Sequence, residues 1–311
     1  MVLTVTLNAA VDRTYRVDGF RLDTVHRCHD VRVVAGGKGV NVARTISRLG
    51  GETAATGILA GHNGSIVADS LTQEGIPASF LWTEGESRTC IAVVDGQART
   101  QTEVNESGPN IPASTADELE AHLRAMISDM PIDYVALCGS VPPGLPDDVY
   151  GTMIDAIWDS GARPVLDSSG EPLRKGYAAG PWMVKPNVLE LMQLIGRNVE
   201  TPCDAADAAT GLLGGRVEVA VVTMGAMGCV VVDRSRRRWV SSPSVPFVSA
   251  VGSGDALLGA MLLTLERGNT WDEAARIGVA AGAANACVYG AGYISSEQVA
   301  QLYAQTDIVE V

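Results

Sequence analysis

A short glycine-rich segment carries the clearest chemical signal in the chain. Residues 251–257 read VGSGDAL, and a helical pattern follows from Asp255. Free backbone N–H groups at a helix N-terminus attract anions. Asp255 could take a proton from an attacking hydroxyl, while the amides of Gly252, Ser253 and Gly254 stabilise charge on a transferring phosphoryl group. These residues could instead simply cap a helix, and this segment alone leaves both interpretations open.

A second glycine cluster precedes another predicted helix. Residues 35–43 read AGGKGVNVA, and the P-loop pattern GxxxxGK[ST] occurs nowhere in the chain. Gly37 and Gly39 fit the dinucleotide motif GxGxxG, but Val42 fills its third position. No acidic residue at a later strand end completes that fingerprint, which disfavours NAD. Close backbone approach, with Asn41 offering both a donor and an acceptor, suits a sugar hydroxyl site better.

A third segment, residues 184–190, reads VKPNVLE. Asn187 can cap the helix that follows it, and Glu190 stands at the capping-box position. That structural role does not exclude a second one, because both side chains face one side of a first turn and could hold the waters of Mg²⁺. Asp167 ends a predicted strand. Its carboxylate is expected at the same sheet edge, where ligands of open α/β sheets gather.

Three further polar residues stand where a ligand could meet them. Asn8 and Asp12 follow the first predicted strand, and Arg88 opens a predicted hairpin. Asn and Asp after a strand could form only a turn, although they also suit sugar hydroxyls. Arg88 is a candidate for bidentate phosphate recognition. An isolated arginine is usually a solvated surface residue, so the role of Arg88 depends on the rest of the pattern.

The elements that would position these motifs alternate along the chain. Periodicity predicts strands over residues 2–7, 53–59, 134–138, 164–167, 182–185 and 219–224. It predicts helices over residues 39–49, 65–73, 147–160, 256–266 and 272–287. This alternation indicates an α/β fold with a doubly wound, mostly parallel sheet flanked by helices.

Two segments break that alternation. Residues 13–34 and 88–105 are predicted to form strands without intervening helices, and the second segment resembles a hairpin that turns at Asp95 and Gly96. They predict a small inserted β-sheet that serves as a lid, a dimer surface or both. No repeat or low-complexity linker divides the chain, which favours one domain over residues 1–311.

Composition restricts the partners. The 311 residues carry a net charge of −13, and only 5% are aromatic. Such a chain is a poor general binder of nucleic acid or anionic membranes, and an anion must be held by a few local cations. The apolar stretch over residues 277–294 is rich in Ala and Gly and is interrupted by Asn285, so we expect a packed internal helix rather than a membrane span.

Cysteine and histidine show no metal pattern. The six cysteines include no CxxC pair, which favours free thiols in a reducing compartment. His26 and His29 lie in a segment predicted as strand, so they would not share a face, and no zinc spacing occurs elsewhere. No secretory signal pattern is visible, and we expect a cytoplasmic protein.

Taken in order, these motifs resemble the ribokinase-like (pfkB) carbohydrate kinase family. The segment GGKGVNVAR is similar to its N-terminal signature, and residues 251–257 are similar to its C-terminal signature. Between them lie CGSVPPG at residues 138–144, DSSG at 167–170, KPNVLE at 185–190 and TMGAMG at 223–228. Within the family the chain is most similar to the hexose-phosphate kinases. Ala9 is a departure, since those kinases usually have proline after the residue matched by Asn8.

The resemblance implies an enzyme that uses ATP and Mg²⁺ to phosphorylate a primary hydroxyl of a ketohexose phosphate. Tagatose 6-phosphate, fructose 1-phosphate and fructose 6-phosphate are the substrates implied. Asp255 matches the catalytic base, with Gly252, Ser253 and Gly254 as the anion hole, and Asn187 and Glu190 match the magnesium-linked motif. The positions that match nucleotide-binding residues are Lys185, Thr223, Gly225, Gly228 and Asn285.

The resemblance also assigns the substrate side and the lid. Asp12, Gly37 and Asn41 match positions that hold the sugar, beside Asn8 suggested above, while Arg88, Lys38 and Arg27 would hold its existing phosphate. The inserted sheet matches a lid that commonly forms the contact of a homodimer. Two alternatives stay open: a kinase of an unphosphorylated sugar or nucleoside, and a non-catalytic protein that binds sugar or nucleotide.

Overall fold

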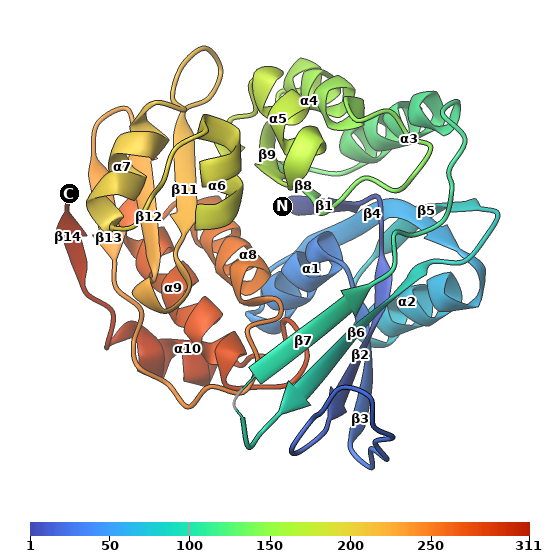
Figure 1. Ribbon diagram of the computed structural model, residues 1–311. Helices are drawn as coiled ribbons and strands as arrows, with labels where there is room; N and C mark the ends of the chain where they lie inside the picture. Colours follow the sequence, from blue (N-terminus) through green and yellow to red (C-terminus); the bar gives the residue numbers. More distant parts are fainter. Residues whose placement is uncertain (99) are drawn as a thin grey trace.

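The computed structural model describes residues 1–98 and 100–311, which contain two sheets (Figure 1). The larger sheet has ten strands in the order β14-β13-β12-β11-β10-β9-β8-β1-β4-β5. Its parallel strands are β1 (Val2–Thr6), β4 (Thr53–Ala60), β5 (Ala78–Thr83), β8 (Tyr134–Cys138), β9 (Arg163–Asp167), β10 (Met183–Val184) and β11 (Val219–Thr223). An antiparallel edge follows, made of β12 (Cys229–Asp233), β13 (Arg237–Val240) and β14 (Ile308–Glu310).

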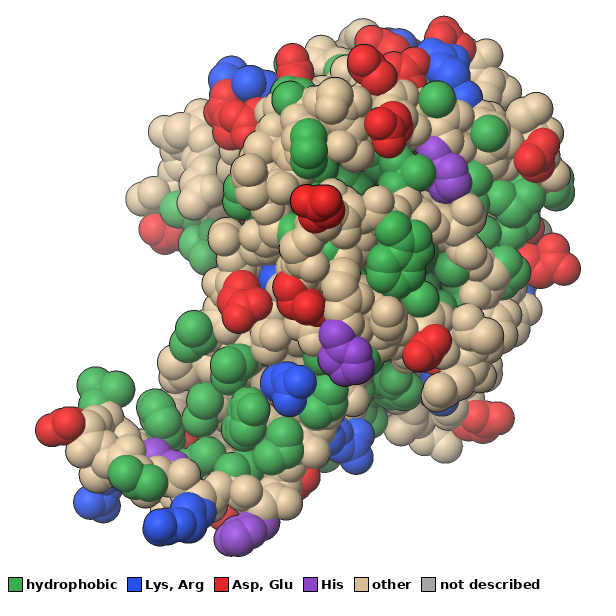
Figure 2. Space-filling view, turned by 90° about the vertical axis from the view of Figure 1, so that its right-hand side faces the viewer, with side chains coloured by type: hydrophobic (Ala, Val, Ile, Leu, Met, Phe, Trp, Pro, Cys, Tyr) green, Lys and Arg blue, Asp and Glu red, His purple; other side chains and the backbone are tan. Residues whose placement is uncertain are grey.

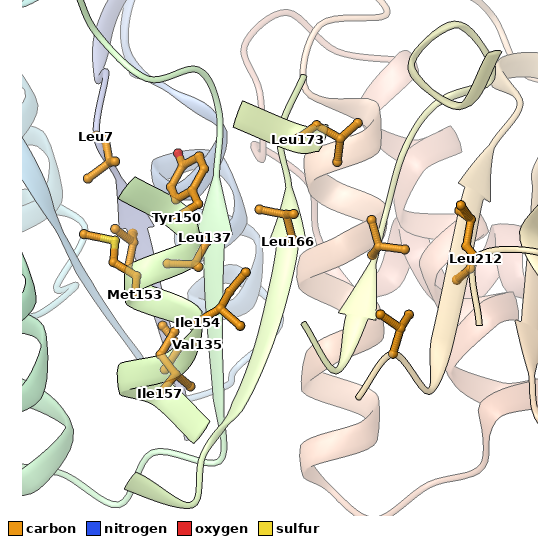
Figure 3. Close-up of a cluster of buried hydrophobic side chains, with 14 of the residues drawn as sticks. Leu7, Val135, Leu137, Tyr150, Met153, Ile154, Ile157, Leu166, Leu173 and Leu212 are labelled. Carbon is orange, nitrogen blue, oxygen red and sulfur yellow. The ribbon is translucent and has the colours of Figure 1, made fainter. Parts of the chain in front are cut away.

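Helices cover both faces of this sheet. One face carries α3 (Thr115–Asp129), α4 (Val149–Ser160), α5 (Gly170–Ala178), α6 (Val188–Ile195) and α7 (Pro202–Thr210). The other carries α1 (Lys38–Arg48), α2 (Gly61–Gln73), α8 (Ser253–Glu266) and α9 (Trp271–Ala286), with α10 (Ser296–Tyr303) packed on α9. Because neither face meets water, strands such as β8 are apolar throughout and fully buried. Figure 3 shows one such layer, where Met153 and Ile154 of α4 pack over Leu137 and Leu166.

The predicted doubly wound sheet is confirmed. The chain starts in the middle of the sheet at β1, winds outward to β4 and β5, and then returns beside β1 as β8 before winding the other way. Ligands of such sheets bind where the winding changes direction, outside the carboxyl ends of the strands. Asp167, Lys185 and Thr223 all stand at those strand ends.

The predicted small sheet is confirmed as a separate unit that projects from the main body (Figure 1). Its order is β3 (Val31–Gly36), β2 (Ala10–Arg16), β6 (Arg88–Asp95) and β7 (Thr100–Asn105). Asp95 fixes the hairpin end, since its carboxylate accepts backbone N–H bonds from Gly19, Phe20 and Gln97. Arg99, within the predicted hairpin, lies outside the described residues.

Some predicted boundaries were wrong. Residues 17–30 are not strand: Gly19 and Asp23 adopt positive φ angles of 71° and 57°, which reverse the chain. His26 and His29 therefore lie in a loop, where His26 Nε2 accepts from the backbone N–H of Arg21 at 3.1 Å. The helix predicted over residues 65–73 starts earlier, at Gly61, and the antiparallel edge of the large sheet was not predicted.

The apolar segment near the C-terminus forms the predicted internal helix, α9, which packs along α8. Across the described part of the chain, no helix combines the length and apolar character needed to cross a bilayer.

Candidate active site

Asp255 lies in the first turn of α8 and is buried, with 7% of its surface exposed. Its Oδ2 accepts a hydrogen bond of 2.8 Å from Asn41 Nδ2. Burial and the negative charge of Asp167 raise the pKa of Asp255 to about 6, although Lys38, Lys185 and the Asn41 bond oppose the change. A carboxylate with this pKa is mostly ionised at neutral pH and can still accept a proton.

The turn before α8 exposes backbone N–H groups beside Asp255. Gly252 has a φ of 76°, and a Cβ there would lie 2.1 Å from Ala291 Cβ, so only glycine fits. The N–H of Ser253 donates to Ala250 O at 3.2 Å. In the described chain, the amides of Gly254 and Asp255 have no backbone acceptor. The Gly252 amide has no backbone acceptor there either, so two of the three predicted amides, those of Gly252 and Gly254, are available together with that of Asp255.

Two lysines meet one buried carboxylate behind this turn. Asp167 Oδ1 lies 2.8 Å from Lys38 Nζ, and its Oδ2 lies 2.8 Å from Lys185 Nζ. Burial raises the pKa of Asp167, but the two lysines outweigh it and hold that pKa below its usual range. Lys185 Nζ also lies 3.6 Å from the position that a Cβ on Gly254 would occupy. Lys185 therefore brings positive charge to the amide turn.

A cavity of about 560 Å³ opens on the other side of the turn. Thr223, Gly225 and Gly228, three of the five residues predicted to bind a nucleotide, line it together with Ser253 and Gly254. Its other lining residues include Asn187, the 242–247 segment and one face of α9, at Val279, Gly282, Ala283 and Ala286. Phe247 and Pro243 in that wall were missed by sequence analysis, because nothing in the local pattern links a coil to a ligand.

Asn285, predicted to bind the nucleotide, is outside the lining of this cavity in the described chain. Its Nδ2 donates to Val251 O at 2.7 Å and to Ser253 Oγ at 3.3 Å, and its Oδ1 accepts from the backbone N–H of Gly292 at 2.8 Å. Two of these contacts are to the glycine turn, and the third is to the loop that follows α9. Asn285 therefore braces the turn.

Asn187 and Glu190 form the predicted capping box at the start of α6. Asn187 Oδ1 accepts from the N–H of Glu190 at 2.9 Å, and Glu190 Oε2 accepts from the N–H of Asn187 at 2.8 Å. Glu190 Oε1 is not used by the cap and lies 3.6 Å from Lys38 Nζ. Among the described residues, no three His, Cys, Asp or Glu side chains form a metal-binding group.

The small sheet carries polar groups to the other side of Asp255. Asp12 on β2 lies against Gly36, where a Cβ would come within 2.1 Å of Asp12 Oδ2. Burial raises the pKa of Asp12 to about 6; Arg88 lowers it, and Asp255 raises it further. Gly37, next in the chain, is the N-cap of α1 with a φ of 108°. Of the predicted sugar residues, Asn41 thus contacts Asp255 directly, and Asp12 lies near enough for the two carboxylates to interact.

Two other predicted substrate residues, Asn8 and Lys38, bond to groups of the protein itself, and a third, Arg27, is exposed. Asn8 is 4% exposed and braces two loops, since its Nδ2 donates to Ser107 O and Ser140 Oγ. Lys38 turns toward Asp167 because that buried carboxylate attracts it. Arg27 is exposed in the 17–30 loop of the small sheet. Arg88 reaches back toward the site, where its Nε donates to Asn8 O at 3.1 Å.

The small sheet also touches the segment that leads into the glycine turn. Ser249 Oγ donates to Gln101 Oε1 of β7 at 3.2 Å, and the N–H of Val251 donates to Ser249 Oγ at 3.3 Å. On the opposite edge, Arg32 Nη1 donates to Tyr289 O at 3.1 Å. The sheet therefore bridges the sugar-side residues and the anion turn. A base, unoccupied amides and two lysines together can support phosphoryl transfer to a hydroxyl.

The pKa of Asp12 predicts a pH-dependent gain in stability for Asp12→Asn. Below about pH 4 the Asp12 carboxyl is neutral in both the folded and the unfolded chain, so its burial does not lower the free energy of unfolding there through ionisation. Between pH 4 and 6 the folded chain holds the proton more tightly than the unfolded chain, so folding stability falls as pH rises. The amide of the variant does not titrate, so the variant avoids this loss. The loss in the free energy of unfolding amounts to up to about 3 kcal/mol.

Urea unfolding of the natural chain and of Asp12→Asn at pH 4.5 and pH 7.5 measures this effect. We expect the free energy of unfolding of the variant, relative to that of the natural chain, to be higher at pH 7.5 than at pH 4.5. An equal change at both pH values would contradict the role of burial.

Comparison with known proteins agrees with this geometry. Residues 5–298 match the sequence pattern of the pfkB family carbohydrate kinases. The tagatose-6-phosphate kinase of Staphylococcus epidermidis strain RP62A is 32% identical over 315 positions, covering 100% of both chains. The structure of phosphofructokinase-2 from Escherichia coli with substrates and products is 29% identical, with a TM-score of 0.89 over 98% of both chains. A possible 1-phosphofructokinase from Thermotoga maritima is 26% identical, with a TM-score of 0.90 over 100% of this chain and 99% of the other. The chain belongs to the pfkB family of carbohydrate kinases.

Proposed function

We propose that this chain transfers the γ-phosphoryl group of ATP to a primary hydroxyl of a phosphorylated ketohexose, forming the bisphosphate. The observation that carries this proposal is Asp255, a buried carboxylate between the amide turn of α8 and the polar face of the small sheet. Residues 1–311 would act as one kinase domain, with the small sheet as its lid. The free cysteines favour the cytoplasm as its location.

In this mechanism Asp255 accepts the proton of the sugar hydroxyl as its oxygen attacks phosphorus. The hydroxyl would be oriented by Asp12 and by the backbone near Gly37. The amides of Gly254 and Asp255, with Lys185 beside them, would stabilise negative charge on the transferring group. The lid would exclude water, which otherwise competes with the sugar as acceptor.

ATP fits the cavity of about 560 Å³, whose apolar wall at Val279 and Ala283 suits a base and whose polar end meets the amide turn. Mg²⁺ usually binds through one or two carboxylates, with waters and substrate phosphates completing its shell. Glu190 Oε1, free of the cap, fits that limited role, and Asn187 orients Glu190. When bound, Mg²⁺ neutralises phosphate charge.

The substrate class follows from Arg88 and from the relatives. Arg88 is the cation of the small sheet that approaches Asp12, and a guanidinium suits the phosphate already on the sugar. The names of the relatives divide between tagatose 6-phosphate and fructose phosphates. A kinase of an unphosphorylated sugar or nucleoside is the alternative, and Arg88 distinguishes the two.

We also propose a homodimer formed through the small sheet. Figure 2 shows hydrophobic side chains gathered on the lobe at the lower left, which is this sheet and its loop. The exposed apolar residues there are Leu22, Val25, Val31, Val33 and Val104. Exposed apolar groups collected on one small unit favour contact with another protein surface.

Asp255→Asn tests the base. Asn keeps the shape and still accepts the Asn41 bond but cannot take a proton, so we expect kcat to fall by about three orders of magnitude or more with ATP affinity unchanged. ADP release with Mg-ATP would be measured against tagatose 6-phosphate, fructose 1-phosphate, fructose 6-phosphate, ribose and adenosine. Near-normal kcat in the variant would overturn the assignment. Turnover of ribose or adenosine alone would overturn the substrate class.

Arg88→Ala tests recognition of the substrate's phosphate. Losing a charge-assisted contact should raise KM for the phosphorylated ketohexose by about tenfold or more, since such bonds contribute about 1.5–3 kcal/mol. KM for ATP should change little. Arg16→Ala is the matched control, because Arg16 lies on the same sheet but is exposed and paired with Asp18. Equal effects in both variants would contradict a phosphate role for Arg88.

Light scattering tests the dimer. The natural chain should have twice the 32.5 kDa chain mass, and Val33→Glu with Val104→Glu should give 32.5 kDa, because each places a charge on the apolar face. Val309→Glu, an exposed valine on β14 far from the small sheet, should leave the dimer intact. A monomeric natural chain would refute this proposal.

A further inference from the structure

Arg44 is the largest side chain of the described residues that is completely removed from solvent. It lies on α1, three residues after Asn41, and sequence analysis gave it no role. A guanidinium can only donate hydrogen bonds, and burying one is costly unless its donors find acceptors. The partners of Arg44 therefore indicate what it is for.

The guanidinium joins four segments around the candidate active site. Its Nε donates to Glu74 Oε2 at 2.6 Å, and its Nη2 donates to Ala35 O at 2.9 Å. Its Nη1 donates to Ala291 O at 3.1 Å and to Asn41 Oδ1 at 3.2 Å. Ala291 is the residue against which Gly252 packs, so Arg44 supports both the glycine turn and Asn41.

The contact with Asn41 decides the orientation of an amide. Because Arg44 offers only donors, the amide edge that faces it must be the oxygen Oδ1. The nitrogen Nδ2 must then point the other way, where it donates to Asp255 Oδ2 at 2.8 Å. The reversed amide would set an N–H group against the guanidinium and an oxygen against the carboxylate, which is unfavourable at both ends.

We propose that Arg44 is a positioning residue for phosphoryl transfer, which holds the Asn41 amide in the orientation that donates to Asp255. This inference rests on the proposed role of Asp255 as the base. Arg44 does not touch the reacting groups and acts through Asn41. Glu74 in turn holds Arg44, and the ring of Tyr293 covers it at 4.7 Å from the ring centre.

The proposal predicts a specific pH effect. The Asn41 bond favours the ionised form of Asp255, so losing it raises the pKa of Asp255 above about 6. The other charged groups that face Asp255 are Asp167, Lys38, Lys185 and Asp12, and they are unchanged in an Arg44 variant. The base would then be protonated, and inactive, at a pH where the natural enzyme still works.

Arg44→Lys tests this, since an ammonium keeps the charge but cannot bond in four directions. We expect the acidic limb of the kcat/KM–pH profile to move up by about one pH unit, which is about a fivefold loss at pH 6 and approaches about tenfold at lower pH. At pH 8.5 the loss should be much smaller. Arg48→Lys is the matched control: Arg48 lies over the same Tyr293 ring at 4.8 Å, but in the described chain it does not bond Asn41.

Two outcomes would overturn the proposal. The first is an equal loss at every pH, or no loss, because a merely structural role predicts no shift of the acidic limb. The second comes from Asn41→Ala, which should show the same shift by itself. Adding Arg44→Lys to Asn41→Ala should then shift the limb no further, and a full additional shift would show that Arg44 does not act through Asn41.

Glu74→Gln provides the test if Arg44→Lys fails to fold. It keeps the shape of the Arg44 partner and removes its charge, so the shift should be smaller and in the same direction; no shift would overturn the proposal. Failure of the proposed function is distinguishable. If Asp255→Asn keeps its activity, Asp255 is not the base and the proposed function fails. If Asp255→Asn is inactive but the pH profile of Arg44→Lys is unshifted, only the role of Arg44 is refuted.

Discussion

The buried carboxylate of Asp167 is the contact on which the candidate site depends. It has no exposed surface, and it is tolerated there because each of its two oxygens forms an ion pair with a lysine. Lys38 begins α1 and Lys185 follows β10, so this interaction ties the glycine-rich start of α1 to the middle of the sheet. The same two ion pairs hold the ammonium groups of Lys38 and Lys185 near Asp255. Burial and the nearby Asp167 charge raise the pKa of Asp255, and the lysines limit that rise.

The small sheet completes the site from the other side. Asp12 and Arg88 come from neighbouring strands β2 and β6, which pair in parallel, so both side chains move with one sheet. The bond between Gln101 and Ser249 links the far strand of this sheet to the segment before the glycine turn. A movement of the sheet would therefore change both the sugar side and the phosphate side. This physical connection suits a reaction that must exclude water before transfer begins.

Much of the fold and the motif-bearing segments could be predicted from the sequence. Apolar runs such as β8 and β11 identify buried parallel strands, and the turn at Asp95 identifies the separate sheet. What could not be predicted depends on contacts between distant segments. Lys38 sits in a glycine-rich loop that suggested a ligand, yet its partner Asp167 is 129 residues away.

The same limit applies to Asn285 and Arg44. Asn285 shares α9 with residues that line the cavity, and only the packing of the helix shows that its side chain faces the turn instead. In the sequence alone, nothing distinguishes Arg44 from the other arginines, because its burial is known only from the structure.

The central claim is that Asp255 is held ready to accept a proton near neutral pH, and a direct titration tests it. With ¹³C-labelled aspartate carboxyls, and the Asp255 signal identified by its absence in Asp255→Asn, we expect a midpoint near pH 6. A midpoint at or below about pH 4, the ordinary value for aspartate, would contradict it.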